Sequence, residues 1–267
     1  MKPAKVKSIL QKKATKMAEV CTAIHENFKE EDIHKFRVQL KSLRAFIRLL
    51  KIISGQKGLK ISRHVKRLYK ILGKMRDSHL QLATLTKQQL ALPAYLEILN
   101  KNIKKQKKKW CENYSPKKLE RFKTRYDGIV QDDFSVAILA SYLVSKIQAI
   151  RKICRDVMLT DARIHELRKQ LKDMLYVMDI AKEEWPEGKQ LVKQWPVKQI
   201  AQLATDIGKY NDGRIRLAQL NSYSQSMAEG KKRKELTVHC SEEVAHLLHQ
   251  KKELINSARQ VLTLIIN

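Results

Sequence analysis

Hydrophobic residues recur at intervals of three and four along nearly the whole chain, which is the period of an α-helix. Residues 32–53 show this pattern most clearly. Their apolar positions form two rows: Ile33, Phe36, Leu40, Leu43, Ile47 and Leu50 along one edge, and Val38, Ala45, Phe46 and Leu49 towards the other. Gly and Pro, which interrupt helices, are scarce at 8 and 5 residues. The pattern therefore predicts an all-α protein.

The same period predicts the other elements. Helices are expected over 4–27, 32–53, 59–89, from Pro93 onwards, and over 117–130, 134–155, 161–182, 196–223 and 241–266. The lysine-dense stretch 101–110 has few apolar anchors, which is typical of a solvated helix or a frayed loop. WPEG at 185–188 is a turn signal, and GKKRK at 230–234 is expected to be an exposed basic loop.

A single row of basic residues runs between the two apolar rows of 32–53. It consists of His34, Arg37, Lys41, Arg44, Arg48 and Lys51. Residues three and four apart share one face of a helix, so these side chains form a stripe about 25 Å long. Aligned like charges repel, so the stripe costs stability unless an anion lies against it. The next predicted helix carries a second basic cluster of Arg63, Lys66, Arg67 and Lys70.

The composition supports an anionic partner. The chain has 267 residues, of which 43% are hydrophobic, so a substantial core is expected and global disorder is not. Its 55 Lys and Arg outnumber its 27 Asp and Glu, which gives a formal net charge of +28. Solubility requires far less charge. A field of this sign attracts phosphate-rich partners or an anionic membrane surface.

Two motifs occur twice, in the same order. IHKFRVQLKSL at 33–43 matches IHELRKQLKDM 131 positions later, and LGKMRD at 72–77 matches IGKYND 135 positions later. Repetition at nearly one offset predicts two similar helical bundles, residues 1–130 and 131–267, as an internal repeat.

The two halves differ in charge. The second keeps His165, Arg168 and Lys172, but Leu175 and Asp179 stand at the positions of Arg44 and Arg48. We therefore expect the first half to carry more of the binding.

These motifs resemble the conserved-histidine α-helical domain, the CHAD family. The residues that match are His34, Arg37, Lys41, Arg44, Gly73, Arg76 and Asp77 in the first half, and His165, Arg168, Lys172, Gly208 and Asp212 in the second. Asn211 stands where an arginine is usual. The resemblance implies two pseudo-symmetric four-helix bundles that together form one domain. It also implies binding of inorganic polyphosphate in a basic central cleft.

The predicted function is therefore non-enzymatic binding of polyphosphate, without a cofactor. Polyphosphate is a chain of repeated negative charge, for which Arg offers a bidentate fork and Lys a point charge. The predicted binding residues are His34, Arg37, Lys41, Arg44, Arg48, Lys51, Arg63, Lys66, Arg67, Lys70, Arg76, His165, Arg168, Lys172, Lys193, Lys198 and Lys209. The family's frequent fusion to a triphosphate-hydrolysing domain implies no hydrolysis here, because the sequence predicts no such β-rich domain.

Four alternatives remain open. The first is that His34 and His165 do not contact the anion but are structural residues packed at the interface of the bundles. An RNA-binding protein would use the same charge together with the runs 101–109 and 231–234. A histidine phosphotransfer protein is less favoured, because Val38 and Lys169 stand where such domains have glycine. A metal site built from His34, His165, Asp77 and Asp212 is opposed by the surrounding cations. The sequence shows no nucleophile motif, glycine-rich phosphate loop or paired carboxylates, so no enzyme is predicted.

The cysteines and the N-terminus indicate the compartment. Cys21, Cys111, Cys154 and Cys240 are widely separated and form no Cys-x-x-Cys, so buried free thiols are expected. The start, MKPAKVKSIL, lacks the apolar stretch of a secretory signal, and no apolar run is long enough to span a bilayer. A soluble, cytoplasmic protein is predicted.

Overall fold

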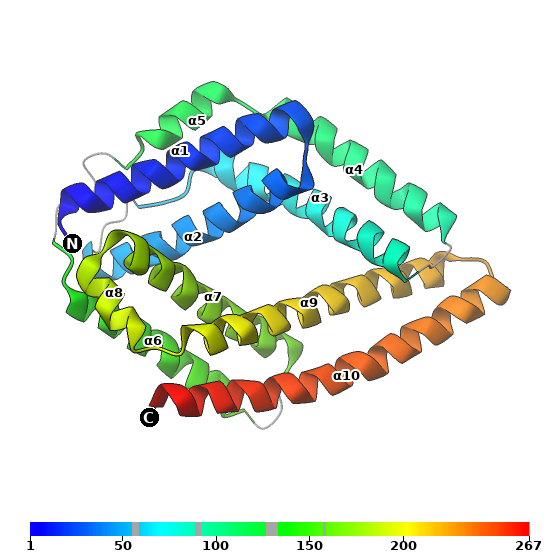
Figure 1. Cartoon of the computed structure of the whole chain (residues 1–267). Helices are drawn as coiled ribbons and strands as arrows, with labels where there is room; N and C mark the ends of the chain where they lie inside the picture. Colours follow the sequence, from blue (N-terminus) through cyan, green and yellow to red (C-terminus); the bar gives the residue numbers. More distant parts are fainter. Residues whose placement is uncertain (55–58, 89–91, 127–132, 157–158, 267) are drawn as a thin grey trace. The chain divides into compact units, whose positions relative to one another are not determined.

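The computed structural model describes residues 1–54, 59–88, 92–126, 133–156 and 159–266. Throughout these ranges the regular structure is helical, which confirms the predicted all-α class (Figure 1). The helices are α1 (Pro3–Asn27), α2 (Glu30–Ser54), α3 (Arg63–Lys87), α4 (Pro93–Asn113), α5 (Pro116–Lys123), α6 (Val136–Cys154), α7 (Asp161–Glu184), α8 (Pro186–Lys193), α9 (Val197–Ser226) and α10 (Lys231–Ile266).

The chain divides into two compact units, Met1–Ile138 and Leu139–Asn267. In the first, α2 packs against both α1 and α3, α3 packs along α4, and α5 packs on α1. In the second, α7 packs against α8 and α9, and α9 and α10 run side by side over most of their length (Figure 1). The sequence places the division between residues 130 and 131. The description of each unit as a four-helix bundle of a repeat stays a prediction.

Both central helices, α2 and α7, begin with acidic residues, which suit the positive end of the helix dipole. Glu30, Glu31 and Asp32 form the first turn of α2, and Asp161 begins α7. The hydroxyl of Thr160 accepts a hydrogen bond from the Arg163 amide at 3.3 Å and caps α7. The acidic first turns and the Thr160 cap stabilise the N-terminal ends of these helices.

The apolar rows of α2 form the core of the first unit, as predicted. Ile33, Phe36, Leu40, Leu43, Ile47 and Leu50 are all buried, as are Ala45, Phe46 and Leu49, and only Val38 is half-buried. Phe36 meets the fully buried Trp110 of α4 edge to face, with ring centroids 6.5 Å apart. The lysine-dense run of α4 is therefore a helix anchored by Ile103, Gln106 and Trp110, with its lysines exposed.

The element boundaries differ most from the predicted ones in four places. Helix α3 begins at Arg63, not near residue 59, because Ser62 caps it by accepting a hydrogen bond from Val65 at 3.2 Å. Helix α5 ends at Lys123, and residues 127–130 of its predicted range lie outside the described residues. Pro186 opens α8, so most of the predicted turn at 185–188 is helical, consistent with the preference of proline for the first helical turn.

The fourth difference concerns the predicted basic loop at 230–234. Helix α10 already begins at Lys231, ten residues before its predicted start, so these basic residues form its first turns. Leu236 and Cys240, which follow the basic run in the first part of α10, are buried. They give this part of the helix an apolar face.

The four cysteines are free thiols, as expected, but Cys111 is exposed, whereas the other three are buried. No helix in the described part of the chain is both long enough and apolar enough to cross a bilayer.

Candidate polyanion-binding site

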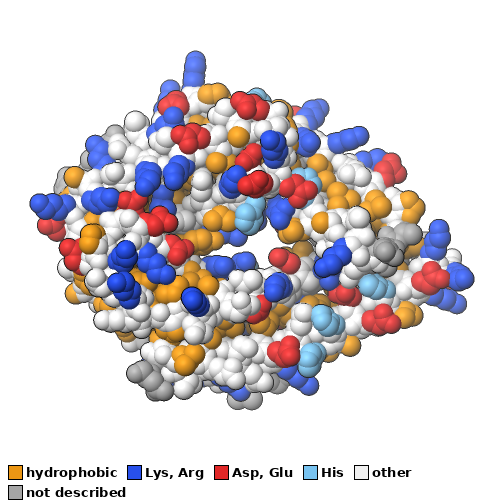
Figure 2. All heavy atoms as spheres, viewed as in Figure 1, with side chains coloured by type: hydrophobic (Ala, Val, Ile, Leu, Met, Phe, Trp, Pro, Cys, Tyr) orange, Lys and Arg blue, Asp and Glu red, His pale blue; other side chains and the backbone are white. Residues whose placement is uncertain are grey.

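Helix α2 presents the predicted basic stripe beside its buried rows. His34, Arg48 and Lys51 are exposed, while Arg37, Lys41 and Arg44 are half-buried. Lys and Arg side chains also spread over the visible face of each unit, with Asp and Glu among them (Figure 2). The half-buried arginines of α2 differ from this general surface because α3 holds them in place.

Three features of α3 hold Arg37. Its Nη1 donates a hydrogen bond to the Tyr69 carbonyl at 3.5 Å, and its guanidinium carbon lies 4.7 Å from the centroid of the Tyr69 ring. One turn later, Gly73 leaves the space that Arg37 fills, since a Cβ added to this glycine would stand 2.7 Å from Arg37 Nη1. A side chain at position 73 would therefore displace the guanidinium.

Arg44 lies over the same tyrosine ring, with its guanidinium carbon 4.5 Å from the centroid. Burial lowers the pKa of Arg44, and the nearby charges of Arg48 and Arg37 lower it further, whereas Tyr69 raises it. Within the described residues, neither Arg37 nor Arg44 forms an ion pair with a carboxylate. Both guanidiniums are thus held by neutral groups, and their positive charge is not cancelled by an acid.

The second unit repeats the contact between arginine and glycine. A Cβ added to Gly208 of α9 would stand 3.2 Å from both Nε and Nη2 of Arg168 on α7. The repeated Leu/Ile-Gly dipeptide thus has the same role in both halves, which is to let the arginine of the His-x-x-Arg helix lie against the neighbouring helix. Glycine has no Cβ, so it permits this close approach at a cost in helix stability.

His165 and Lys172 complete the basic row of α7. His165 is exposed and Lys172 is half-buried. Burial lowers the pKa of Lys172, and the charge of Arg168 lowers it further against the opposing effect of Asp179. Leu175, which stands at the position of Arg44, is buried. This position therefore belongs to the core of the second unit, which explains why the basic row ends here.

An acidic residue at the start of each central helix binds an arginine from the neighbouring helix. Glu30 of α2 pairs with Arg76 of α3 at 2.8 Å, and Asp161 of α7 pairs with Arg214 of α9 at 2.8 Å. The two acids are 131 positions apart, as are His34 and His165. Both acids therefore hold an arginine close to the histidine of the His-x-x-Arg motif. Together with burial, the charge of Arg76 contributes to lowering the pKa of His34, and the charge of Arg214 contributes to lowering that of His165.

Arg214 is a functional candidate that is not among the predicted binding residues, because the sequence alone does not place it. Asn211 occupies the place of the expected arginine, but it is buried, and its amide donates to the Ile207 carbonyl at 2.9 Å. Arg214 lies three residues later on the same face of α9 and supplies the charge instead. A search for arginine one turn beyond a lost motif position would have found it.

Several predicted binding residues take no part in the contacts between these helices. Arg63, Lys66 and Lys70 are exposed on α3, and Lys193 and Lys198 are exposed at the end of α8 and the start of α9. Arg67 donates to Asn113 of α4 at 3.2 Å. Lys209 pairs with Asp206 at 3.2 Å and lines a groove with Gln250 and Glu253 of α10. Lys209 thus has acidic neighbours, which weaken its attraction for phosphate.

Asp161 is expected to stabilise the second unit. It accepts hydrogen bonds from Tyr210 at 2.7 Å and Lys251 at 3.2 Å in addition to pairing with Arg214, so it joins α7, α9 and α10. Burial raises its pKa, but these three partners outweigh that effect and leave the pKa below its ordinary value. Replacing Asp161 with asparagine should cost about 1–2 kcal/mol, measured by denaturant unfolding.

Asp206→Asn is the matched control for that variant. Among the described residues, Asp206 pairs only within α9, with the exposed Lys209 and with Gln202, so its replacement should cost less than about 0.5 kcal/mol. Equal losses from the two substitutions would contradict the stabilising role of Asp161.

Four histidines should make the protein less stable in mild acid. Burial and neighbouring cations lower the pKa values of His34, His64, His79 and His165. The unfolded chain, with histidine pKa values of about 6.5, therefore binds more protons than the folded chain as the pH falls through this range. We expect the melting temperature to be a few degrees lower at pH 5 than at pH 7.5, and a higher value at pH 5 would contradict this account.

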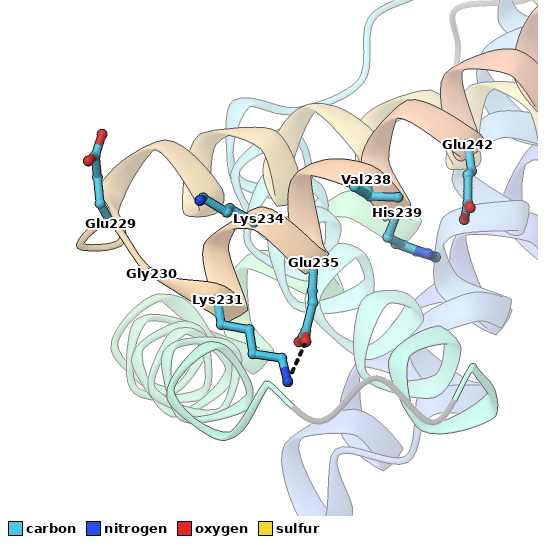
Figure 3. Close-up of a pocket in the computed structure, with 8 residues that line it drawn as sticks. All are labelled: Glu229, Gly230, Lys231, Lys234, Glu235, Val238, His239 and Glu242. Carbon is cyan, nitrogen blue, oxygen red and sulfur yellow. Dashed lines mark ion pairs between the residues drawn. The ribbon is translucent and has the colours of Figure 1, made fainter.

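No group of three or more potential metal ligands occurs among the residues whose placement is described. His239 and Glu242 line a pocket at the start of α10 (Figure 3). That pocket also contains Glu229, Lys231, Lys234 and Glu235, and Lys231 pairs with Glu235 at 4.0 Å. Its mixed charge favours neither a metal ion nor a polyanion.

The fold and the site define a class: an all-helical protein in which a His-x-x-Arg helix packs on a glycine-containing helix in each of two units. The model of the CHAD domain family matches residues 8–221, and the chain belongs to this family. The fold is similar to that of the crystal structure of the CHAD domain from the plant Ricinus communis. The TM-score is 0.74 at 15% identity, over 98% of this chain and 91% of that chain. No curated protein matches significantly.

Proposed function

We propose that this protein binds inorganic polyphosphate without transforming it, mainly through the basic residues of α2 and α3. The observation that carries the proposal is the arrangement of Arg37 and Arg44, which Tyr69 and Gly73 hold in place without a carboxylate partner among the described residues. Fixed guanidinium groups lose little freedom when they bind a phosphate oxygen, and each can offer two parallel donors.

Other basic surfaces fit a polyanion less well. Glu229, Glu235 and Glu242 lie among the basic residues at the start of α10, and Lys101 of α4 pairs with Glu97 at 2.7 Å. Trp110 and Trp185 are buried and Trp195 is half-buried, so the tryptophans offer little surface on which nucleobases could stack. These features support a phosphate chain over RNA as the ligand.

Affinity for long-chain polyphosphate should be high and should depend steeply on salt. An array of cations gains affinity by releasing the counterions of the polymer, so log affinity should fall linearly as log salt concentration rises. Titrations at several salt concentrations, with RNA and orthophosphate as competitors, provide the test. A flat salt response, or orthophosphate competing as well as polyphosphate mole for mole, would contradict the proposal.

A further inference from the structure

Tyr69 is the residue of this site that no charge pattern identifies. It is half-buried on α3, and its ring meets two guanidinium groups from α2, at 4.7 Å for Arg37 and 4.5 Å for Arg44. Arg37 and Arg44 are seven residues apart, which is about two helical turns. One aromatic ring therefore organises two cations that would otherwise repel each other and spread apart.

The ring lies against one side of each guanidinium. An aromatic face is electrostatically negative and attracts a cation placed over it. The N–H donors of a guanidinium lie in its plane, so an arginine with a ring on one side can still donate hydrogen bonds. In Arg37 one of these donors already binds the Tyr69 carbonyl. What the arginine loses is one of the two sides on which a nucleobase could stack.

We propose that Tyr69 is a positioning residue that makes the site selective for phosphate chains over nucleic acids. The inference rests on the proposed function and adds the source of its selectivity. With one side covered by the ring, Arg37 and Arg44 still present N–H donors that suit phosphate oxygens in either ligand. RNA gains less from stacking than it would on uncovered arginines, because its bases can approach each guanidinium only from the side away from the ring.

Among the described residues, the arrangement of one tyrosine ring beside two arginines occurs in the first unit and not at the matching positions of the second. Tyr69 lies four residues before Gly73, and the residue four before Gly208 is Ala204, which is fully buried. Leu175, also buried, stands at the position of Arg44. The second unit thus keeps the contact between Arg168 and Gly208 but has neither the ring nor the second guanidinium. Selectivity should therefore depend on Tyr69 even though the basic motif occurs twice.

The test compares Tyr69→Leu and Tyr69→Phe with the unchanged protein. Affinity is measured for long-chain polyphosphate and for unstructured single-stranded RNA at one ionic strength. Tyr69→Leu should lose about tenfold in polyphosphate affinity, since two cation–π contacts are removed, while RNA affinity is unchanged or higher. Tyr69→Phe keeps the ring and should retain both affinities within about twofold.

Tyr114→Leu is the matched control. Tyr114 is another half-buried tyrosine of the first unit, but it stacks on His25 with ring centroids 4.1 Å apart and contacts no arginine of α2 among the described residues. Its replacement should leave the ratio of the two affinities unchanged. Melting temperatures of all variants separate a loss of folding from a loss of positioning.

The outcomes distinguish the two proposals. If the unchanged protein does not bind polyphosphate, the proposed function itself fails. If it binds and Tyr69→Leu keeps the same ratio of polyphosphate to RNA affinity, the selectivity role of Tyr69 is wrong. Equal weakening of both ligands with a lowered melting temperature would show a purely structural tyrosine and would also overturn the inference.

Discussion

Replacing both Arg37 and Arg44 with glutamate is expected to reduce polyphosphate affinity by about a hundredfold or more. Each arginine can form charge-assisted hydrogen bonds with phosphate, worth about 1.5–3 kcal/mol, and each glutamate adds repulsion. The loss should appear as a higher dissociation constant and as a shallower dependence of log affinity on log salt.

The matched control is the charge reversal of Lys107 and Lys108, which changes the net charge equally. Both lysines are exposed on α4, where salt screens charges beyond about 10 Å. Their reversal should cost much less affinity. Arg37→Gln with Arg44→Gln provides a second test that places no buried negative charge near Tyr69. Equal losses from the arginine and lysine pairs would mean that binding depends on net charge alone.

Gly73→Ala is expected to weaken polyphosphate binding by about tenfold while leaving the protein as stable as before, or more so. The added methyl group would stand 2.7 Å from Nη1 of Arg37, so the guanidinium must move. Because that group ends a flexible side chain, its movement costs little folding energy, and alanine gains about 0.5–1 kcal/mol over glycine inside a helix. Losing one well-placed charged contact corresponds to about a tenfold change.

Gly208→Ala serves as the comparison in the second unit. There the added methyl group would stand 3.2 Å from two nitrogens of Arg168, a milder conflict, so a smaller loss of affinity is expected. Thermal unfolding and polyphosphate titration of both variants separate stability from binding. An unchanged affinity for Gly73→Ala would show that the observed position of Arg37 is not the one that binds phosphate.

The sequence by itself determined the helical class and the faces of the central helix. Apolar residues at helical spacing lie on the same side of α2, so that side must face the core. In the structure, nine of the ten apolar positions named in the sequence analysis are buried. The two repeated motifs also sufficed to identify the CHAD family, which the family model confirms. These features follow from the spacing and the order of residues, which can be read directly from the sequence.

Helix ends were less predictable, for local reasons. GKKRK has the composition of a loop, yet its four basic residues belong to α10, because Leu236 and Cys240 are buried and extend the helix. Proline and glycine at 185–188 signal a turn, but proline also opens helices, and α8 begins there. In both places tertiary packing or a positional preference outweighed composition.

Only the tertiary structure decided which basic residues act together. Spacing placed Arg37 and Arg44 on one face of α2, but it could not show that Tyr69 of the next helix joins them, or that Gly73 makes room for Arg37. Nor could it show that Arg214 replaces the arginine missing at Asn211. Such contacts depend on how two helices pack, and helix packing depends on side chains that are distant along the chain.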